Sequence, residues 1–361
     1  MSRRLTRRSF FRRSAATTVT AAGFAMGSCT ASRAVARETT HPTARDTFGL
    51  RQQGGKIPVI LDTDIGGDID DTWALVMLLK SPELDVKLVT SDSGNDTYRA
   101  RIIAKILQIA ARTDVPVGVG CLAGDKPGPQ SAWVGDYDLS QYPGTIHEDG
   151  VGAIINVIRA SQVPVTLVAI GPVPNIPEAL RRAPDIAEKA RFVGMHGSVR
   201  RGYGGSQEVA AEYNVQQNPK ALQEVFAAPW DVTITPLDTC GIVHLEGERF
   251  EKVYRCQDPV VQALMENYRV WLAAGHRPEG LVGKDKRAPD VLVKSSTLFD
   301  TVAVYLAISQ SLLEIEDLPI RVTDEGFTVI EENARTAHCA TRWKSLDGFK
   351  DELVARLTAQ R

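Results

Sequence analysis

Acidic residues are concentrated in one short segment, Asp62-Thr-Asp-Ile-Gly-Gly-Asp-Ile-Asp-Asp71, which follows a run of apolar residues. The segment holds five carboxylates in ten residues, whereas average composition supplies about one. Like charges packed this closely repel one another unless they are solvated, protonated or bound to a cation. Gly66 and Gly67 allow a tight turn, so the carboxylates on either side of them can converge. The segment therefore predicts a cation site.

The donor atoms of this segment indicate which cation it would bind. All of the charged groups are carboxylates and no Cys or His lies nearby, a donor set that selects a hard ion such as calcium or magnesium. Asp70 and Asp71 could instead cap the helix predicted after them. That interpretation accounts for one or two of the acids and leaves the others unexplained, so metal binding is the better prediction.

Alternating strands and helices must position this segment. Short β-branched runs alternate with helical stretches from Lys56 onward, which predicts a single α/β domain, Rossmann-like, with a mostly parallel central sheet and helices on both faces. The predicted strands are Pro58–Leu61, Val86–Thr90, Val117–Gly120, Val165–Ile170, Phe192–Met195 and Val232–Thr235. The predicted helices are Thr72–Lys80, Tyr98–Ala111, Val151–Ala160, Pro219–Ala227, Pro259–Ala274, Leu298–Leu312 and a closing helix, Leu346–Leu357. A hairpin is predicted over Ile320–Ile330, turning at Glu325-Gly326.

The acidic segment resembles the opening motif of the inosine-uridine preferring nucleoside hydrolases, Asp-x-Asp-x-Gly followed by Asp-Asp before an Ala-Leu-rich helix. This chain departs from the motif by two extra residues within Gly67-Asp68-Ile69. Haloacid-dehalogenase-like phosphatases also carry Asp-x-Asp after a first strand, but normally with Thr or Val where this chain has Gly66. The nucleoside hydrolase match is the better one, and it implies the matching fold and Ca²⁺ as the cofactor.

The resemblance covers roughly Pro58 to Leu318 and implies roles for individual residues. It implies that calcium is held by Asp64, Asp71, Asp300 and the main-chain carbonyl of Pro174, the last within Ala169-Ile-Gly-Pro-Val-Pro-Asn175. Ser206 stands where the family usually has an assisting Asn, so that contact is not expected here. Substrate-binding roles are implied for Asp70, Asn95, His147, Met195, Glu212, Asn214 and Phe299.

These residue types suit cleavage of an N-glycosidic bond. Glycoside cleavage passes through an oxocarbenium-like transition state, which carboxylates and hydrogen bonds to sugar hydroxyls stabilise. We therefore predict calcium-dependent hydrolysis of a small-molecule nucleoside or related N-ribosyl compound to free base and ribose, with Asp64 as the base that takes the proton from water. The alternative is a non-catalytic, calcium-dependent protein that binds nucleosides or sugars at the cell surface. The Asp64, Asp71 and Asp300 set favours catalysis, because a binding protein needs no base to activate water.

The sequence indicates less directly which group protonates the leaving base than which groups bind the cation. Many family members have His before the last calcium ligand, where it can help to protonate the base, and this chain has Phe299. A phenyl ring cannot donate a proton, but it can stack on a purine, so we predict a preference for purine nucleosides. His147 or His196 could supply the acid from another loop, although such histidines more often have structural roles.

The N-terminus has the composition of an export signal. A basic start containing Thr6-Arg-Arg-Ser-Phe-Phe11 precedes a small-residue, weakly apolar stretch, and this order is typical of twin-arginine signals. Cleavage is expected either at a lipobox ending in Cys29 or after Ala34-Val-Ala36. We therefore predict an export signal over residues 1–36, a disordered linker over 37–55 and the hydrolase domain over 56–361, in a protein that is periplasmic, secreted or lipid-anchored at the cell surface.

Composition excludes some other classes of protein. The net charge of -2 argues against a nucleic-acid partner, and no apolar run is long enough to span a membrane, so any membrane anchor would be a lipid. Cys121, Cys240, Cys256 and Cys339 show no metal-ligand spacing, and free thiols are favoured over disulfides. The family resemblance implies a homo-oligomer, a dimer or a tetramer.

Overall fold

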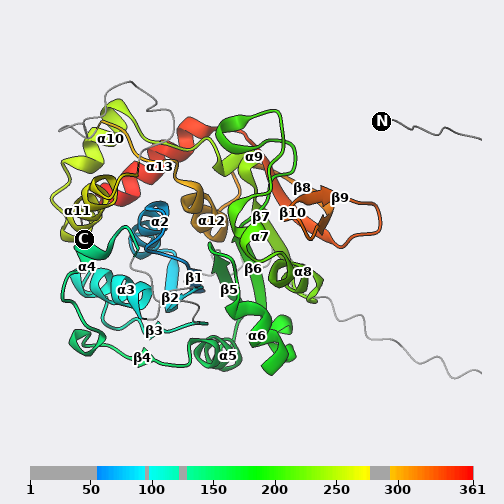
Figure 1. Ribbon diagram of the computed structural model, residues 1–361, viewed down its shortest axis with the longest axis horizontal. Helices are drawn as coiled ribbons and strands as arrows, with labels where there is room; N and C mark the ends of the chain where they lie inside the picture. The colour runs from blue at the N-terminus through cyan, green and yellow to red at the C-terminus, as the bar shows by residue number, and fades with distance from the viewer. Residues whose placement is uncertain (1–54, 94–96, 122–127, 277–292, 361) are drawn as a thin grey trace, which may run out of the picture. The chain divides into compact units, whose positions relative to one another are not determined.

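The computed structural model describes residues 55–93, 97–121, 128–276 and 293–360 of the 361-residue chain. Within these ranges one sheet has the strand order β4-β3-β2-β1-β5-β6-β7-β10-β8-β9 (Figure 1). Its strands are β1 Ile57–Thr63, β2 Leu84–Ser91, β3 Val117–Gly118, β4 Ile146–His147, β5 Val165–Ala169, β6 Ala190–Met195, β7 Val232–Thr235, β8 Leu313–Val322, β9 Thr328–Ile330 and β10 Thr336–Trp343.

The sheet is parallel from β4 across to β10, and only β8 and β9 at its far edge run antiparallel to their neighbours. The order of the strands reverses at β1, which pairs with β2 on one side and with β5 on the other. Loops leaving the carboxyl ends of β1 and β5 diverge at such a point, which makes it the usual ligand site in open α/β sheets.

Helices cover both faces of the sheet, because alternate strand residues are apolar on both sides. In β1, Val59 and Leu61 pack into one hydrophobic cluster and Ile60 packs into the other. Figure 1 shows α2 and α12 on one side of the strands and α5 and α6 on the other. The helices are α2 Asp70–Leu79, α3 Tyr98–Ile109, α4 Ser131–Val134, α5 Gly150–Ala160, α6 Asn175–Arg182, α7 Tyr213–Gln217, α8 Pro219–Ala227, α9 Leu237–Cys240, α10 Gly247–Tyr254, α11 Pro259–Ala273, α12 Phe299–Ile308 and α13 Leu346–Thr358.

This architecture confirms the predicted α/β fold class and each predicted strand, with small shifts at the strand ends. The hairpin is also confirmed, because Ile320 pairs with Ile330 and Gly326 turns with a φ of 87°. The helix predicted to run to Leu312 ends at Ile308 instead, because Ser309 adopts an extended conformation and β8 begins at Leu313. Strand β10 was not predicted, since its buried residues include the small side chains Ala337 and Cys339, which give a weak strand signal.

Two further predictions concern the rest of the chain. No helix in the described ranges is long and apolar enough to cross a membrane. The four described cysteines carry free thiols, and two of them, Cys240 and Cys339, are buried. The predicted export signal and most of the predicted linker lie outside the described residues.

Candidate active site

The acidic segment forms the loop between β1 and α2, and three neighbouring side chains hold its main chain. Gly66 has a φ of 102°, and a Cβ there would lie 2.7 Å from the ring of Tyr98, so glycine is required. The Tyr98 hydroxyl donates to the Gly66 carbonyl at 3.1 Å, and Arg99 Nη1 donates to the carbonyl of Ile65 at 2.8 Å. Gln130 Nε2 donates to the carbonyl of Asp68 at 2.9 Å. The insertion is therefore part of a fixed loop.

Three buried carboxylates converge at the start of α2. Each of Asp70, Asp71 and Asp300 offers an oxygen within 4.8 Å of the others. Burial raises the pKa of all three well above its usual value, and the neighbouring carboxylates raise it further. Two carboxyl groups as close as those of Asp70 and Asp300 repel each other when both are charged, which favours a proton on one of them. A cation could replace that proton, and oxygen-only donors fit calcium or magnesium.

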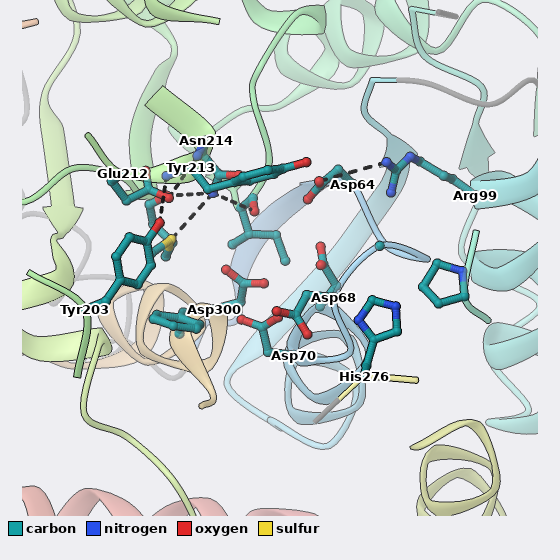
Figure 2. A pocket seen from close by; sticks show the side chains of 16 residues that line it. Asp64, Asp68, Asp70, Arg99, Tyr203, Glu212, Tyr213, Asn214, His276 and Asp300 are labelled. Carbon is teal, nitrogen blue, oxygen red and sulfur yellow. Dashed lines mark hydrogen bonds and ion pairs between the residues drawn. The ribbon is translucent and has the colours of Figure 1, made fainter. Parts of the chain in front are cut away.

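Asp64 lies beside this cluster at the end of β1, and 9% of its surface is exposed. Burial raises the pKa of its carboxyl group, while the Arg99 guanidinium acts in the opposite direction from 4.0 Å away. Figure 2 shows the Asp64 carboxylate between Arg99 on one side and the cluster on the other. Asp64 is thus a carboxylate at the pocket surface that has its own cationic neighbour.

Glu212 and Asn214 form the opposite wall of the site, at the start of α7. Glu212 caps that helix by accepting from the main-chain N–H groups of Asn214 and Val215, and it also accepts from Gly197. Burial raises the pKa of Glu212 to about 7 in spite of these hydrogen bonds. Asn214 Nδ2 donates to the carbonyl of Ile170, which directly follows β5, and to that of Met195, which ends β6.

These groups line one cavity with a volume of about 350 Å³, in the range of small-molecule sites. The rings of Tyr203 and Phe299 meet edge to face at 6.0 Å and supply an aromatic wall. In Figure 2, His276 lies across the acidic cluster from Tyr203. The lining residues are Asp64, Gly67, Asp68, Asp70, Asp71, Arg99, Pro129, Ile170, Met195, Tyr203, Glu212, Tyr213, Asn214, His276, Phe299 and Asp300.

Most of the predicted site residues thus lie in a single cavity. It contains Asp64, Asp70, Asp71, Met195, Glu212, Asn214, Phe299 and Asp300. Asn95 lies outside the described residues.

Pro174, His147 and His196 do not line the cavity. The carbonyl of Pro174 lies 3.9 Å from the Cys121 thiol. His147 ends the edge strand β4, which β3 and β2 separate from β1. His196 is fully buried with its Nε2 against the Gly171 carbonyl, and burial lowers its pKa to about 4. The two histidines are therefore not placed to protonate a group bound in the cavity.

The cavity also holds residues for which no role was predicted. Ile170 could have been found from the sequence, because it directly follows β5 and strand ends carry ligand sites. Arg99 lies in the first turn of α3, and His276 lies three residues after the end of α11. Neither belongs to a local motif, so only the tertiary structure reveals them.

Comparison with known proteins agrees with this arrangement. The family profile of the inosine-uridine preferring nucleoside hydrolases matches residues 59–351. A pyrimidine-specific ribonucleoside hydrolase, RihA of Escherichia coli, is 30% identical over 326 residues, covering 83% of this chain and 98% of that protein. A purine-preferring ribonucleoside hydrolase from Gardnerella vaginalis superposes with a TM-score of 0.65 at 22% identity, over 83% of this chain and 98% of that chain. An inosine-uridine preferring nucleoside hydrolase from Bacillus anthracis gives a TM-score of 0.64 at 19% identity, over 84% and 99%.

Proposed function

The chain belongs to the inosine-uridine preferring nucleoside hydrolase family, and from this premise we propose that it cleaves the N-glycosidic bond of ribonucleosides in a calcium-dependent reaction. The observation that carries the proposal is the meeting of Asp70, Asp71 and Asp300 in one cavity with Asp64 and Asn214. That set combines oxygen donors for a cation, a carboxylate for a proton and an amide for a sugar hydroxyl.

Asp64, Asp71 and Asp300 are the side chains that we propose to hold calcium. Asp70 belongs to the same acidic cluster and lines the cavity, where it would contact a ribose hydroxyl. Ile170 lines the cavity and Pro174 does not, so the carbonyl of Ile170 is better placed to add a main-chain oxygen. When bound, calcium would lower the pKa of a water molecule and orient it with the sugar diol.

The chain's own side chains perform the remaining steps. Asp64 accepts the proton of the attacking water, for which its position at the cavity surface and its Arg99 neighbour suit it. Glu212 and Asn214 hydrogen-bond the ribose from the opposite wall. The surrounding carboxylates favour the positive charge that develops on the sugar as the base departs.

We propose a preference for purine bases, resting on the aromatic wall. Phe299 cannot donate a proton to the leaving base, but Phe299 and Tyr203 present rings against which a bicyclic base gains more contact than a pyrimidine. The named relatives do not decide the matter, because one is pyrimidine-specific and another is purine-preferring.

A panel of purine and pyrimidine nucleosides tests this function, with calcium and with chelator, scored for free base and ribose. We expect inosine to be cleaved faster than uridine. We expect Phe299→Ala to lower the rate of inosine cleavage by a larger factor than it lowers the affinity for calcium. Equal turnover of inosine and uridine would contradict the purine preference. Calcium-dependent nucleoside binding without any release of base would instead favour the binding-protein alternative.

We further propose that the protein is exported through a twin-arginine signal and forms homo-oligomers. Thr6-Arg-Arg-Ser-Phe-Phe11 and the small-residue stretch after it support export. Replacing Arg7 and Arg8 with Lys should leave the protein in the cytoplasm, as fractionation would show. Normal export of the double variant would remove the targeting proposal.

A further inference from the structure

Asp92 is a buried carboxylate behind the cavity that the proposed reaction does not use. It directly follows β2, is 1% exposed and does not line the cavity. It forms no ion pair with any described residue, and burial and the nearby carboxylates Asp62 and Asp64 raise its pKa. An acid in this position is unfavourable unless it forms specific hydrogen bonds.

The hydrogen bonds of Asp92 tie it to the loop that follows β5. Its Oδ2 accepts from the main-chain N–H of Val173 at 2.7 Å, and its Oδ1 accepts from that of Ser93. Val173 is buried and has a φ of 54°, a left-handed conformation that is rarely adopted by a β-branched residue. Such strain persists only where the surroundings enforce it, and the bond from Asp92 is the contact that fixes this N–H.

The loop lies directly against the candidate base. A Cβ at Gly171 would meet Asp92 Oδ2 at 2.7 Å and Asp64 Cβ at 3.0 Å, so the chain passes between the two acids. The preceding residue, Ile170, lines the cavity, and its carbonyl accepts from Asn214. A change at Val173 would therefore be transmitted to Asp64 and to Asn214.

Other contacts hold the two ends of the loop, and at its centre the Val173 carbonyl accepts from the Ile176 N–H at 3.2 Å. His196 Nε2 donates to the Gly171 carbonyl at 3.0 Å. Asn175 Nδ2 donates to Asp62 Oδ1 at 2.7 Å and to the Ser91 carbonyl at 2.9 Å. Asp92 is the side chain that holds the N–H of this strained residue.

We propose that Asp92 is a positioning residue: by holding Val173 in its left-handed conformation, its carboxylate sets the Ile170–Asn175 loop against Asp64 and the cavity. The inference rests on the proposed function for its link to turnover. The substrate need not touch Asp92, since Asp92 acts through the main chain.

A double-mutant cycle of Asp92→Ala and Val173→Gly tests the proposal, because glycine adopts the left-handed conformation without help. We expect Asp92→Ala to lower kcat at least tenfold when residue 173 is valine and less than threefold when it is glycine. Asp92→Asn keeps an acceptor oxygen and should stay within threefold of the wild type. Equal losses in the two backgrounds, or a loss of less than threefold with valine, would overturn the proposal.

A matched control is Asp238→Ala. Asp238 is also buried and accepts from two loop N–H groups, those of Val199 and Arg200, at 2.8 Å each, but none of the three residues lines the cavity. Asp238→Ala should lower the Tm and leave kcat within threefold. If Asp92→Ala does not fold, the double variant with Asp92→Ala and Val173→Gly tests the proposal in its place. A double variant that is inactive or unfolded would contradict the proposal.

A failure of the proposed function can be distinguished from a failure of the proposal for Asp92. If the wild type cleaves no nucleoside, the same cycle is measured as the calcium concentration that gives half of the maximal rise in Tm. Asp92→Ala should then raise that midpoint at least fivefold with valine at position 173 and less than twofold with glycine. Equal midpoints in all four proteins would overturn the proposal.

Discussion

The carboxylate of Asp64 differs from the other acids of the cavity because a guanidinium faces it. Arg99 Nη2 lies 4.0 Å from Asp64 Oδ2, whereas Asp70, Asp71 and Asp300 are surrounded by further acids. This asymmetry supports Asp64 as the group that accepts a proton from water, in addition to its proposed contact with calcium beside Asp71 and Asp300.

Asp64→Asn should therefore lower kcat by about 10²- to 10⁴-fold, the usual contribution of a general base. Initial rates of base release at saturating calcium measure the effect. Asp114→Asn is the control, since Asp114 pairs with Arg112 at the protein surface and should leave kcat unchanged. An Asp64→Asn variant with more than a tenth of wild-type turnover would assign the base elsewhere.

Glu212 should make the stability of the protein depend on pH. Burial raises its pKa to about 7, above the value near 4.3 of an unfolded chain, so the fold favours the protonated form. The stability that this group contributes is complete below about pH 4 and is lost as the pH rises through about 7.

Urea unfolding in chelator between about pH 5 and pH 8 should show the unfolding free energy of the wild type falling with pH more steeply than that of Glu212→Gln. Glutamine keeps an acceptor for the helix cap and does not titrate. The same pH dependence in both proteins would show that Glu212 does not titrate in this range.

At the scale of elements, a buried ammonium group ties three helices together. Lys80 directly follows α2, and its Nζ lies 2.5 Å from Asp258 Oδ2 at the start of α11 and 2.6 Å from the Ala359 carbonyl after α13. The Lys80 side chain is 1% exposed, so removing its partner leaves a charge in the interior.

Asp258→Ala should lower the unfolding free energy by about 3 kcal/mol, the cost of leaving one member of a buried pair alone. Lys80→Met removes the charge itself and should cost less than half as much. Urea unfolding of both variants measures the difference, and neither should change kcat. A larger loss in Lys80→Met would show that the packing of the lysine chain, and not its charge, ties these helices together.

The elements of the fold differ in how far the sequence could predict them. Strands such as Val165–Ala169 are short runs rich in β-branched residues and fully buried, and that pattern was sufficient. Strand β10 has no such run, because its place in the sheet depends on pairing with β7 and β8. The helix Asn175–Arg182 was missed because Pro177 within it and Pro174 before it are typical of loops.

The part of the candidate site formed by residues close together in sequence was predictable. The part formed by contacts between distant segments of the chain was not. The acidic loop is contiguous in sequence, and its convergence followed from its glycines. The main-chain calcium ligand was predicted at Pro174 from a motif match, which does not show where β5 ends. The structure places Ile170, directly after β5, at the cavity, and Pro174 is not among the cavity's lining residues. Arg99 and Asp92 act through contacts with residues distant in sequence, which no spacing reveals.

At the scale of the whole molecule, the cavity combines segments from most of the chain at the point where the strand order reverses. Its residues run from Asp64 to Asp300, and the sheet brings them to the carboxyl ends of β1, β5 and β6. The fold thus concentrates buried carboxylates that repel one another. A bound cation relieves that repulsion, so the ion should affect stability as well as turnover.

Titrating calcium into chelator-stripped protein, while following inosine cleavage and the Tm in parallel, tests the central claim most directly. We predict that the stripped protein is inactive, that free hypoxanthine and ribose appear as calcium is added, and that turnover and Tm rise over the same concentrations. Full turnover in chelator, or a rise in Tm without any cleavage of inosine or another nucleoside, would contradict a calcium-dependent ribonucleoside hydrolase.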